Sequence, residues 1–211
     1  VDVKSYFASV DHEVLRDRLA RATADRRLLD LLGDLLRHGA EQPGKGMPIG
    51  NLTSQMFANL YLDPLDHFVK EQLGVRHYLR YMDDAVCLLD DQASARGCLE
   101  ALEIFLDQRL RLRLNPLRTL IAPLTAPADV LGYVHRAGQG TRVRRRSVQR
   151  LWHRLPHLAA REQCGELTSA QVRASLASWI GLAKHADAFR LSRSLFFARD
   201  VRNLGKRLLV G

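Results

Sequence analysis

Two adjacent aspartates, Asp83 and Asp84, are the residues whose type and spacing most strongly suggest chemistry. They lie in the stretch RYMDDAV, between aromatic and apolar residues that are typical of β-strands. A buried carboxylate needs a partner, so two carboxylates side by side require an explanation. The β-rich runs on either side, HYLRY and AVCLL, predict a hairpin that carries the acidic pair at its turn.

A third carboxylate, Asp2, belongs to the segment VDVKSYFASV, which we expect to form a strand. A strand there would pair beside the hairpin and bring the three carboxylates to one point. Carboxylate oxygens are hard ligands that suit Mg²⁺, and divalent cations relieve the repulsion between them. Two ions about 4 Å apart are the standard arrangement for in-line phosphoryl transfer. Taken alone, an Asp-Asp pair in a turn is common, and a solvated turn or a helix N-cap would explain it.

The elements that must position these residues divide the chain into a mixed part and a helical part. Hydrophobic periodicity predicts helices and two short later strands in the first part, and it predicts helices throughout the segment after Arg142. Thr168 and Gln171 form a capping box that opens one of these later helices. We therefore expect an α+β domain followed by an all-helical one. The expected helices span 12–22, 25–38, 53–73 and 92–113, and the expected strands span 118–123 and 129–135.

Composition excludes several classes of protein. The chain has 211 residues, of which 46% are hydrophobic, so it buries a substantial core. No apolar run is long enough to span a bilayer, and we expect a cytoplasmic protein without a membrane partner. The three cysteines indicate neither a disulfide framework nor a zinc site. Because the chain starts with Val and a motif begins at its second residue, we expect it to be cut from a longer protein.

Positive charge is concentrated in the C-terminal third. Residues 1–133 carry 16 Lys and Arg against 19 Asp and Glu, whereas residues 134–211 carry 16 against 4. Such a segment favours a polyanionic partner, most often nucleic acid, over the alternative of a solvated basic surface. The run from Arg142 to Arg146 is the strongest candidate for phosphate contact. Other arginines in the segment include Arg150, Arg154, Arg190, Arg193, Arg199, Arg202 and Arg207.

Five stretches, in order, resemble motifs of the bacterial reverse transcriptases, and the resemblance covers nearly the whole chain. VDVKSYFASVDH resembles the first catalytic motif, with Asp2 as metal ligand and Phe7 as the gate that excludes a 2′-hydroxyl. YMDD resembles the second catalytic motif, with Asp83 and Asp84. PIGNLTSQMFANLYLDPLD resembles the loop and helix that support the template and the incoming nucleotide. LNPLRTLIAP and VLGYV resemble two later palm motifs, the second of which is the primer grip.

The resemblance implies the palm and thumb of a right-hand polymerase. The palm, an antiparallel sheet with packed helices, would cover 1–135 with residual fingers elements around 25–50. A basic helical thumb would cover 136–211, with most of the fingers missing upstream. The enzyme would be an RNA-directed DNA polymerase that takes an RNA template, a DNA or RNA primer and dNTPs. It would use two Mg²⁺ ions, with Mn²⁺ as a substitute.

The same resemblance implies a set of site residues. Besides the three catalytic aspartates, the backbone of Val3 would hold metal. The expected substrate-binding residues are Phe7, Ile49, Gly50, Ser54, Gln55 and Arg118. The expected nucleic-acid contacts are Tyr81, Met82, Leu131, Gly132, Arg142, Arg144, Arg145, Arg146, Arg150 and Lys184.

The stretch IGNLTSQ resembles the reverse transcriptases of diversity-generating retroelements. Most bacterial reverse transcriptases have Gln where Ile49 stands and Pro where Gln55 stands. These retroelement enzymes copy a template RNA with frequent errors opposite adenine and work with a small basic accessory protein. A glutamine would hydrogen-bond near the nascent base pair, and isoleucine cannot, so a polar check on pairing would be absent. The alternative is that Ile49 is simply a packed loop residue.

Two departures from the family limit what the resemblance implies. Arg118 stands where the family often has a lysine that protonates pyrophosphate, and arginine does not release its proton near neutral pH. The fingers that bind the triphosphate would lie upstream of Asp2, so the isolated chain could fold without being active.

The alternatives to a retroelement enzyme are another bacterial reverse transcriptase (phage-defence, CRISPR-associated or group II intron-like) and a maturase-like RNA-binding protein. We expect His12 to lie exposed at the start of a helix.

Overall fold

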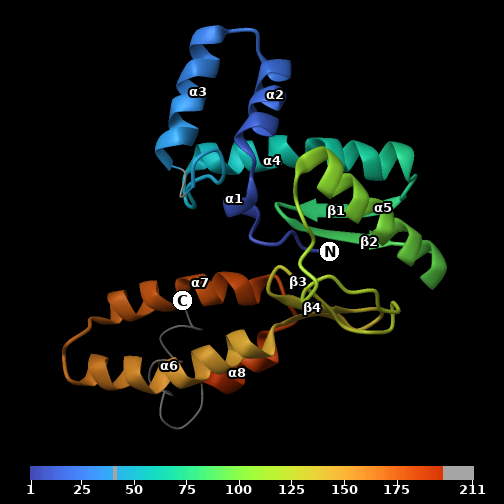
Figure 1. Ribbon diagram of the computed structural model, residues 1–211. Coiled ribbons are helices and arrows are strands. Elements are labelled where there is room, and N and C mark those ends of the chain that lie inside the picture. Colours follow the sequence, from blue (N-terminus) through green and yellow to red (C-terminus); the bar gives the residue numbers. More distant parts are fainter. Residues whose placement is uncertain (40–41, 197–211) are drawn as a thin grey trace. The chain divides into compact units, whose positions relative to one another are not determined.

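The computed structural model describes residues 1–39 and 42–196, which form two compact units (Figure 1). The first unit ends at residue 122 and the second begins at residue 123. Both contain helices and small antiparallel sheets, which is compatible with the predicted α+β class. The division falls before residues 128–135, which the sequence assigns to the first domain but whose contacts belong to the second unit. Within the described residues, none of the helices has the length and apolar content needed to cross a bilayer.

The first unit is built mainly from helices that pack on the buried face of a central helix, α4. Three of the four helices predicted here have close to their expected bounds. The fourth passes through Pro64 as α4 and continues into a short π-helix, η1. In chain order the elements are α1 (Tyr6–Ser9), α2 (His12–Ala22), α3 (Arg26–Gly39), α4 (Leu52–His67), η1 (Phe68–Gln72), β1 (His77–Tyr81), β2 (Asp84–Leu88) and α5 (Gln92–Leu110).

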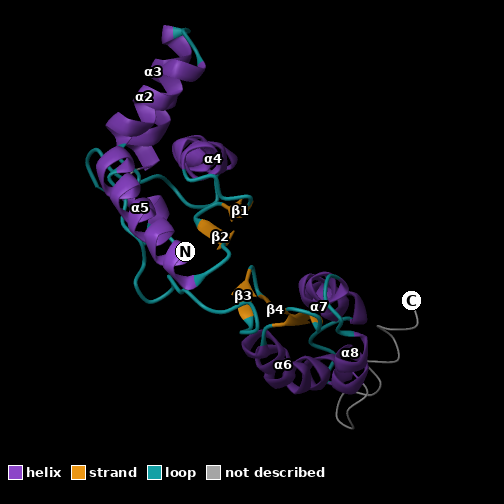
Figure 2. Cartoon of the chain, turned by 90° about the vertical axis from the view of Figure 1, so that its right-hand side faces the viewer, coloured by secondary structure: helices purple, strands orange, loops and turns teal. Residues whose placement is uncertain are grey.

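Strands β1 and β2 form the predicted antiparallel hairpin, drawn in orange in Figure 2. The register runs from His77 opposite Leu88 to Tyr81 opposite Asp84. Met82 has a positive φ of 53°, in the left-handed region that non-glycine residues seldom adopt. The tight turn therefore contains Met82 and Asp83, and Asp84 opens the second strand. The prediction that the acidic pair lies at the hairpin turn is confirmed.

The strand predicted over the first ten residues is wrong beyond its first positions. Only Asp2 and Val3 make β-bridges, and the chain then turns at Ser5 into α1. Ser5 has a φ of 47°, which ends the extended backbone. Tyr6 and Val10, four residues apart, are both buried, and this helical spacing outweighs the β-propensity of the individual residues.

In its described part, residues 123–196, the second unit pairs a three-stranded sheet with three helices. Its sheet has the antiparallel order β3-β4-β5, and the leucines of α6 pack against α7 and α8. The predicted capping box of Thr168 and Gln171 is confirmed at the start of α7. The elements are β3 (Ala128–Val130), β4 (Tyr133–Arg136), β5 (Gly140–Val143), α6 (Arg145–Gln163), α7 (Ser169–Lys184) and α8 (Phe189–Phe196). The arginines Arg199, Arg202 and Arg207 lie outside the described residues.

Two strand predictions need correction. Residues 118–123 form no strand, because Leu120 is exposed and the segment begins with a turn in which the Asn115 carbonyl accepts from the Arg118 and Thr119 amides. Residues 129–135 hold two strands, not one, because Leu131 and Gly132 form a turn with positive φ. Strand β5 was not predicted, because its glycine and its arginine have low β-propensity. Pairing with β4 stabilises it as a strand despite this low propensity.

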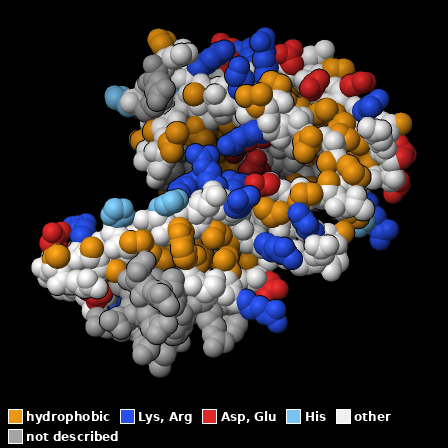
Figure 3. All heavy atoms as spheres, turned by 90° about the horizontal axis from the view of Figure 1, so that it is seen from below, with side chains coloured by type: hydrophobic (Ala, Val, Ile, Leu, Met, Phe, Trp, Pro, Cys, Tyr) orange, Lys and Arg blue, Asp and Glu red, His pale blue; other side chains and the backbone are white. Residues whose placement is uncertain are grey.

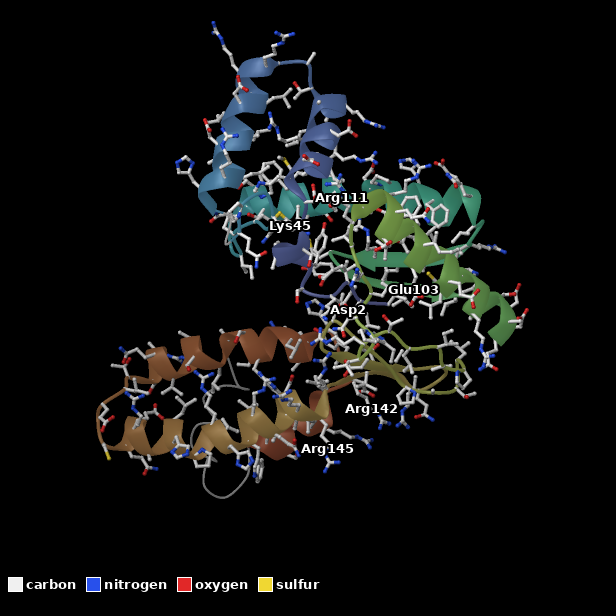
Figure 4. All side chains as sticks on the ribbon, viewed as in Figure 1. Asp2, Lys45, Glu103, Arg111, Arg142 and Arg145 are labelled. Atoms are coloured by element: carbon white, nitrogen blue, oxygen red, sulfur yellow. The ribbon has the colours of Figure 1, made fainter. Side chains whose placement is uncertain are left out.

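Tyr61 joins three helices of the first unit. Its side chain is 0% exposed, and its hydroxyl donates to the Leu110 carbonyl at 2.6 Å and accepts from the Asp11 amide at 3.2 Å. Asp11 in turn caps α2, and Arg111, labelled in Figure 4, donates to the Asp11 carboxylate at 2.9 Å. One buried phenol thus ties the start of α2 to the end of α5 through α4.

Tyr61→Phe is expected to destabilise the protein by about 1–3 kcal/mol, because it leaves the buried Asp11 amide and Leu110 carbonyl without their partner. Urea unfolding followed by circular dichroism measures the change. The matched control is Tyr81→Phe, whose side chain is 59% exposed, and its effect should stay within about 0.5 kcal/mol. Equal stability of the two variants would contradict the prediction.

Candidate active site

Backbone pairing brings the first acidic segment against the hairpin. Asp2 and Asp84 form an antiparallel β-bridge, and the Ala85 amide donates to the Val1 carbonyl at 2.9 Å. Figure 4 shows Asp2 below the hairpin and within the first unit. Asp83 lies in the tight turn immediately before Asp84, so the backbone brings the three predicted aspartates to the same end of the hairpin. A two-residue bridge, and not the predicted full strand, produces this proximity.

Asp2 is held by two side chains from the segment after α5. Its side chain is buried; Asn115 Nδ2 donates to Oδ2 at 3.0 Å and Arg118 Nη1 donates to Oδ1 at 3.3 Å. The Asn115 amide also donates to the Asp2 carbonyl at 2.8 Å. Sequence reasoning singled out Arg118 but missed Asn115. The available signal was an asparagine before Pro116, a residue pair that favours a tight turn.

The two hairpin carboxylates are destabilised in their charged form. Burial raises the pKa of Asp84, and a hydrogen bond with Asp2 and the negative charges of Asp2 and Asp83 raise it further. Burial also raises the pKa of Asp83, with a smaller contribution from the charge of Asp2. The positive charge of Arg118 opposes both shifts without cancelling them. The cluster therefore carries more negative charge than its neighbours balance.

The chemistry of these donors suits a hard divalent cation. Carboxylate oxygens and a backbone carbonyl are ligands that Mg²⁺ accepts, and a cation would stabilise the charged carboxylates against the burial and the repulsion that raise the two pKa values. In the described part of the chain, however, no group of three or more His, Cys, Asp or Glu side chains is arranged to hold a metal ion. The oxygens of Asp2 bind Asn115 and Arg118 instead. A metal centre at Asp2, Val3, Asp83 and Asp84 stays a prediction.

A short loop fixes the segment that carries Phe7. The Met47 amide donates to the Phe7 carbonyl at 2.9 Å, and the Gly46 amide donates to the Val10 carbonyl at 2.8 Å. The Phe7 ring is half-buried and lies edge-on to Tyr6, with ring centroids 5.6 Å apart. This gate candidate is therefore positioned by backbone bonds from residues 46 and 47.

His12 is not the exposed helix-start residue that the sequence suggested. Its side chain is buried, and its Nε2 lies 2.7 Å from the Gly46 carbonyl. The His12 amide also donates to the Gly44 carbonyl at 3.0 Å. The histidine therefore reinforces the attachment of the glycine-rich loop, which is a long-range interaction that no local pattern reveals.

The predicted substrate residues at the start of α4 fall into two groups. Ile49, Gly50 and Gln55 are exposed, and the side chain of Ile49 is 82% exposed. This exposure contradicts the alternative of Ile49 as a packed loop residue. Ser54 is 1% exposed, so its hydroxyl packs inside the first unit and is not available for direct contact with a nucleotide.

The remaining candidates lie on β1, on the turn after it and in the second unit. Tyr81 is exposed and Met82 is half-buried in the turn. Leu131 and Gly132 form the β3–β4 turn, and the Gly132 carbonyl accepts from the Arg144 amide at 3.1 Å. Lys184, at the end of α7, is exposed.

Most of the predicted phosphate-binding arginines are exposed around the start of α6. Arg142 and Arg145, labelled in Figure 4, flank this start, and Arg146 and Arg150 follow on exposed positions of the helix. Arg144 differs from the others, because its Nε donates to the Asp129 carboxylate at 2.8 Å. On the face seen in Figure 3, Lys and Arg side chains gather in several groups.

Comparison with known proteins identifies a family. Residues 1–135 match the model of the family described as reverse transcriptase (RNA-dependent DNA polymerase). Protein YkfC of Escherichia coli (strain K12) is 25% identical over 170 residues, which cover 63% of this chain and 45% of YkfC. The chain thus spans less than half the length of this relative. Because the family match takes in more than half of the chain, including Asp2 and the Asp83–Asp84 turn, this protein belongs to the reverse transcriptase (RNA-dependent DNA polymerase) family.

Proposed function

We propose that the chain is the palm and thumb of an RNA-directed DNA polymerase that adds dNTPs to a primer 3′-end on an RNA template. The observation that carries the proposal is the β-bridge between Asp2 and Asp84, which gathers the three aspartates within the family-matched region. Residues 1–135, the family-matched region, would then serve as the palm, with fingers elements around 25–50, and the basic residues 136–211 would serve as the thumb.

Asp2, Asp83, Asp84 and the Val3 carbonyl are the groups that would hold the two Mg²⁺ ions. When bound, such ions activate a primer hydroxyl and neutralise the charge on the triphosphate and its leaving group. Asn115 orients the Asp2 carboxylate through its side chain and fixes the Asp2 backbone through its amide. These two bonds aim Asp2 toward the hairpin turn.

Arg118 acts by charge and not by proton transfer. Its guanidinium keeps its proton near neutral pH, so it cannot serve as the acid that protonates pyrophosphate. It lies 3.3 Å from Asp2, and its side chain is largely exposed, so it can also reach an anionic ligand. We therefore assign it to neutralising negative charge at the site.

The decisive test is primer extension with dNTPs and Mg²⁺ on an RNA template, using the natural full-length protein. We expect extension by the wild type and its loss in Asp83→Asn, which removes one carboxylate from the cluster while keeping its shape. Asp90→Asn is the matched control, because it makes the same change at an exposed position beyond the hairpin. Equal extension by all three proteins would refute the assignment.

A protein that binds RNA tightly but extends no primer would support the alternative of a maturase-like RNA-binding protein. In that case, RNA binding should be the same in Asp83→Asn as in the wild type.

The exposed Ile49 supports a more specific assignment, the error-prone enzyme of a diversity-generating retroelement. An isoleucine side chain presents no hydrogen-bonding group, so at this position it cannot test the geometry of a nascent base pair. Such an enzyme would work with a small basic accessory protein and would copy a template RNA into a variable gene. A variable-protein gene beside this one, flanked by template and variable repeats, would distinguish this role from those of other bacterial reverse transcriptases.

Ile49→Gln is expected to lower misincorporation opposite adenine by about fivefold, the factor that corresponds to one net hydrogen bond. Sequencing of cDNA pools made on one template measures the error frequency at each base. Leu52→Gln makes the same change at a neighbouring exposed position and should leave the errors unchanged. An unaltered adenine error rate in Ile49→Gln would remove this residue from the explanation.

Replacing Arg145, Arg146 and Arg150 with Ala is expected to weaken primer–template binding. For each arginine that binds a phosphate in the wild type, its removal should reduce the slope of log affinity against log salt by about 0.7–0.9. Arg144 is left in place, because its ion pair with Asp129 supports the second unit. Fluorescence anisotropy across a salt series measures the slope, and Arg161→Ala, in the last turn of the same helix, is the control. If the triple variant keeps the wild-type slope, these arginines face only solvent.

A further inference from the structure

Arg80 is a charged side chain inside the first unit that the site described above does not use. It lies in β1, and its side chain is 9% exposed. Its Nε donates to Asp66 Oδ1 at 2.7 Å and its Nη2 donates to Asp66 Oδ2 at 2.5 Å. This two-armed ion pair joins the hairpin to α4, which carries Asp66.

The remaining guanidinium nitrogen, Nη1, donates a hydrogen bond to the hairpin turn. Arg80 Nη1 donates to the Met82 carbonyl at 2.9 Å and makes a longer bond, 3.3 Å, to Asn59 Oδ1. Arginine presents its donors in a rigid planar fork, so the two bonds to Asp66 determine where the third donor points. The helix α4 therefore sets the position of the Met82 carbonyl through one side chain.

The Met82 carbonyl oxygen is the backbone atom of the turn to which Arg80 donates a hydrogen bond. It belongs to the same peptide group as the Asp83 amide, so its position sets the plane of the peptide that leads into Asp83. Met82 also has a φ of 53°, a conformation that is unfavourable for its side chain and needs support from its surroundings. Fixing this carbonyl thus fixes the peptide plane that orients Asp83.

Asp66, the ion-pair partner of Arg80, is itself fixed by a further hydrogen bond. The Tyr78 hydroxyl donates to Asp66 Oδ1 at 2.8 Å. Burial alone would raise the pKa of Asp66, but the hydrogen bonds from Arg80 and Tyr78 outweigh it and hold that pKa below its usual range. Asp66 is therefore a permanent anion near neutral pH, and it keeps the guanidinium in one orientation.

We propose that Arg80 is a positioning residue: anchored on Asp66, it holds the Met82–Asp83 peptide so that the Asp83 carboxylate is directed toward a divalent cation. The proposal rests on the proposed function for its consequence in catalysis. It concerns the geometry of the turn, so cation binding tests it even without polymerisation.

The test compares Arg80→Lys with wild type in the full-length protein. Lysine keeps the positive charge and can pair with Asp66, but a single ammonium lacks the fork that reaches the Met82 carbonyl as well. We expect Mn²⁺ affinity, measured from the electron paramagnetic resonance signal of free Mn²⁺, to fall by about tenfold, as for the loss of a group that orients a metal ligand. In primer extension, kcat should fall and the Mg²⁺ requirement should rise, while the primer–template Kd stays unchanged.

Two variants separate positioning from general support of the fold. Arg111→Lys changes an arginine that is ion-paired in the same unit but away from the hairpin, and it should bind Mn²⁺ like the wild type. Asp66→Asn removes the negative charge but keeps Arg80 available to Met82. It should lower the melting temperature and reduce Mn²⁺ affinity by less than Arg80→Lys does, because the amide oxygen still accepts one of the two bonds that orient the guanidinium. This contrast between stability and cation affinity is the signature of a positioning role.

Wild-type Mn²⁺ affinity and Mg²⁺ dependence in Arg80→Lys would overturn the proposal. So would an affinity loss in Asp66→Asn that equals the loss in Arg80→Lys, since the ion pair and not the bond to Met82 would then be responsible. If Arg80→Lys does not fold, the double variant Asp66→Asn/Arg80→Gln replaces it, because neither substituted side chain is charged. The double variant is then compared with the single variant Asp66→Asn. If the wild type binds Mn²⁺ but extends no primer, the polymerase assignment is refuted. The difference in Mn²⁺ affinity between Arg80→Lys and the wild type still tests the positioning role of Arg80.

Discussion

Burial of closely spaced carboxylates is the constraint on which the acidic end of the hairpin depends. Asp2 and the Asp83–Asp84 turn come from distant parts of the sequence, and backbone hydrogen bonds at Val1 and Ala85 hold them together. The cost of this arrangement appears in the raised pKa values of Asp83 and Asp84, which come first from burial and then from the negative charge of Asp2. Asn115 and Arg118, in the segment after α5, bind the Asp2 carboxylate and so help to hold the first acidic segment in place.

Two arginines serve this acidic cluster in different ways. Arg118 is largely exposed and lies directly against Asp2, so it lowers the local negative charge and remains available to a ligand. Arg80 is buried and touches the backbone of the turn but none of the three aspartates. One arginine therefore acts on charge and the other on geometry, and both functions use a cation that does not titrate near neutral pH.

Local sequence patterns were sufficient for the helices and the hairpin but not for the interactions that complete the site. Helices α2, α3 and α5 follow from their hydrophobic period, and the hairpin follows from two β-rich runs around a tight turn. The strand expected at residues 1–10 failed because burial of Tyr6 and Val10 favours a helical turn. Asn115 and the buried His12 were missed because their partners are 113 and 34 positions away in the chain, and no local pattern encodes such pairings.

The sequence separation of these hydrogen bonds has a consequence for folding. The bonds that order Asp2 join it to Asn115 and Arg118, 113 and 116 positions later, and those that bind Arg111 to Asp11 close a loop of similar length. Bonds between residues so far apart in the sequence form late, because closing the loop costs chain entropy before the bonds can compensate for it. During synthesis, a chain that has not yet reached residue 115 lacks both Asn115 and Arg118, the two side chains after α5 that bind the Asp2 carboxylate. We therefore expect the final orientation of this carboxylate to be set late in the folding of the first unit.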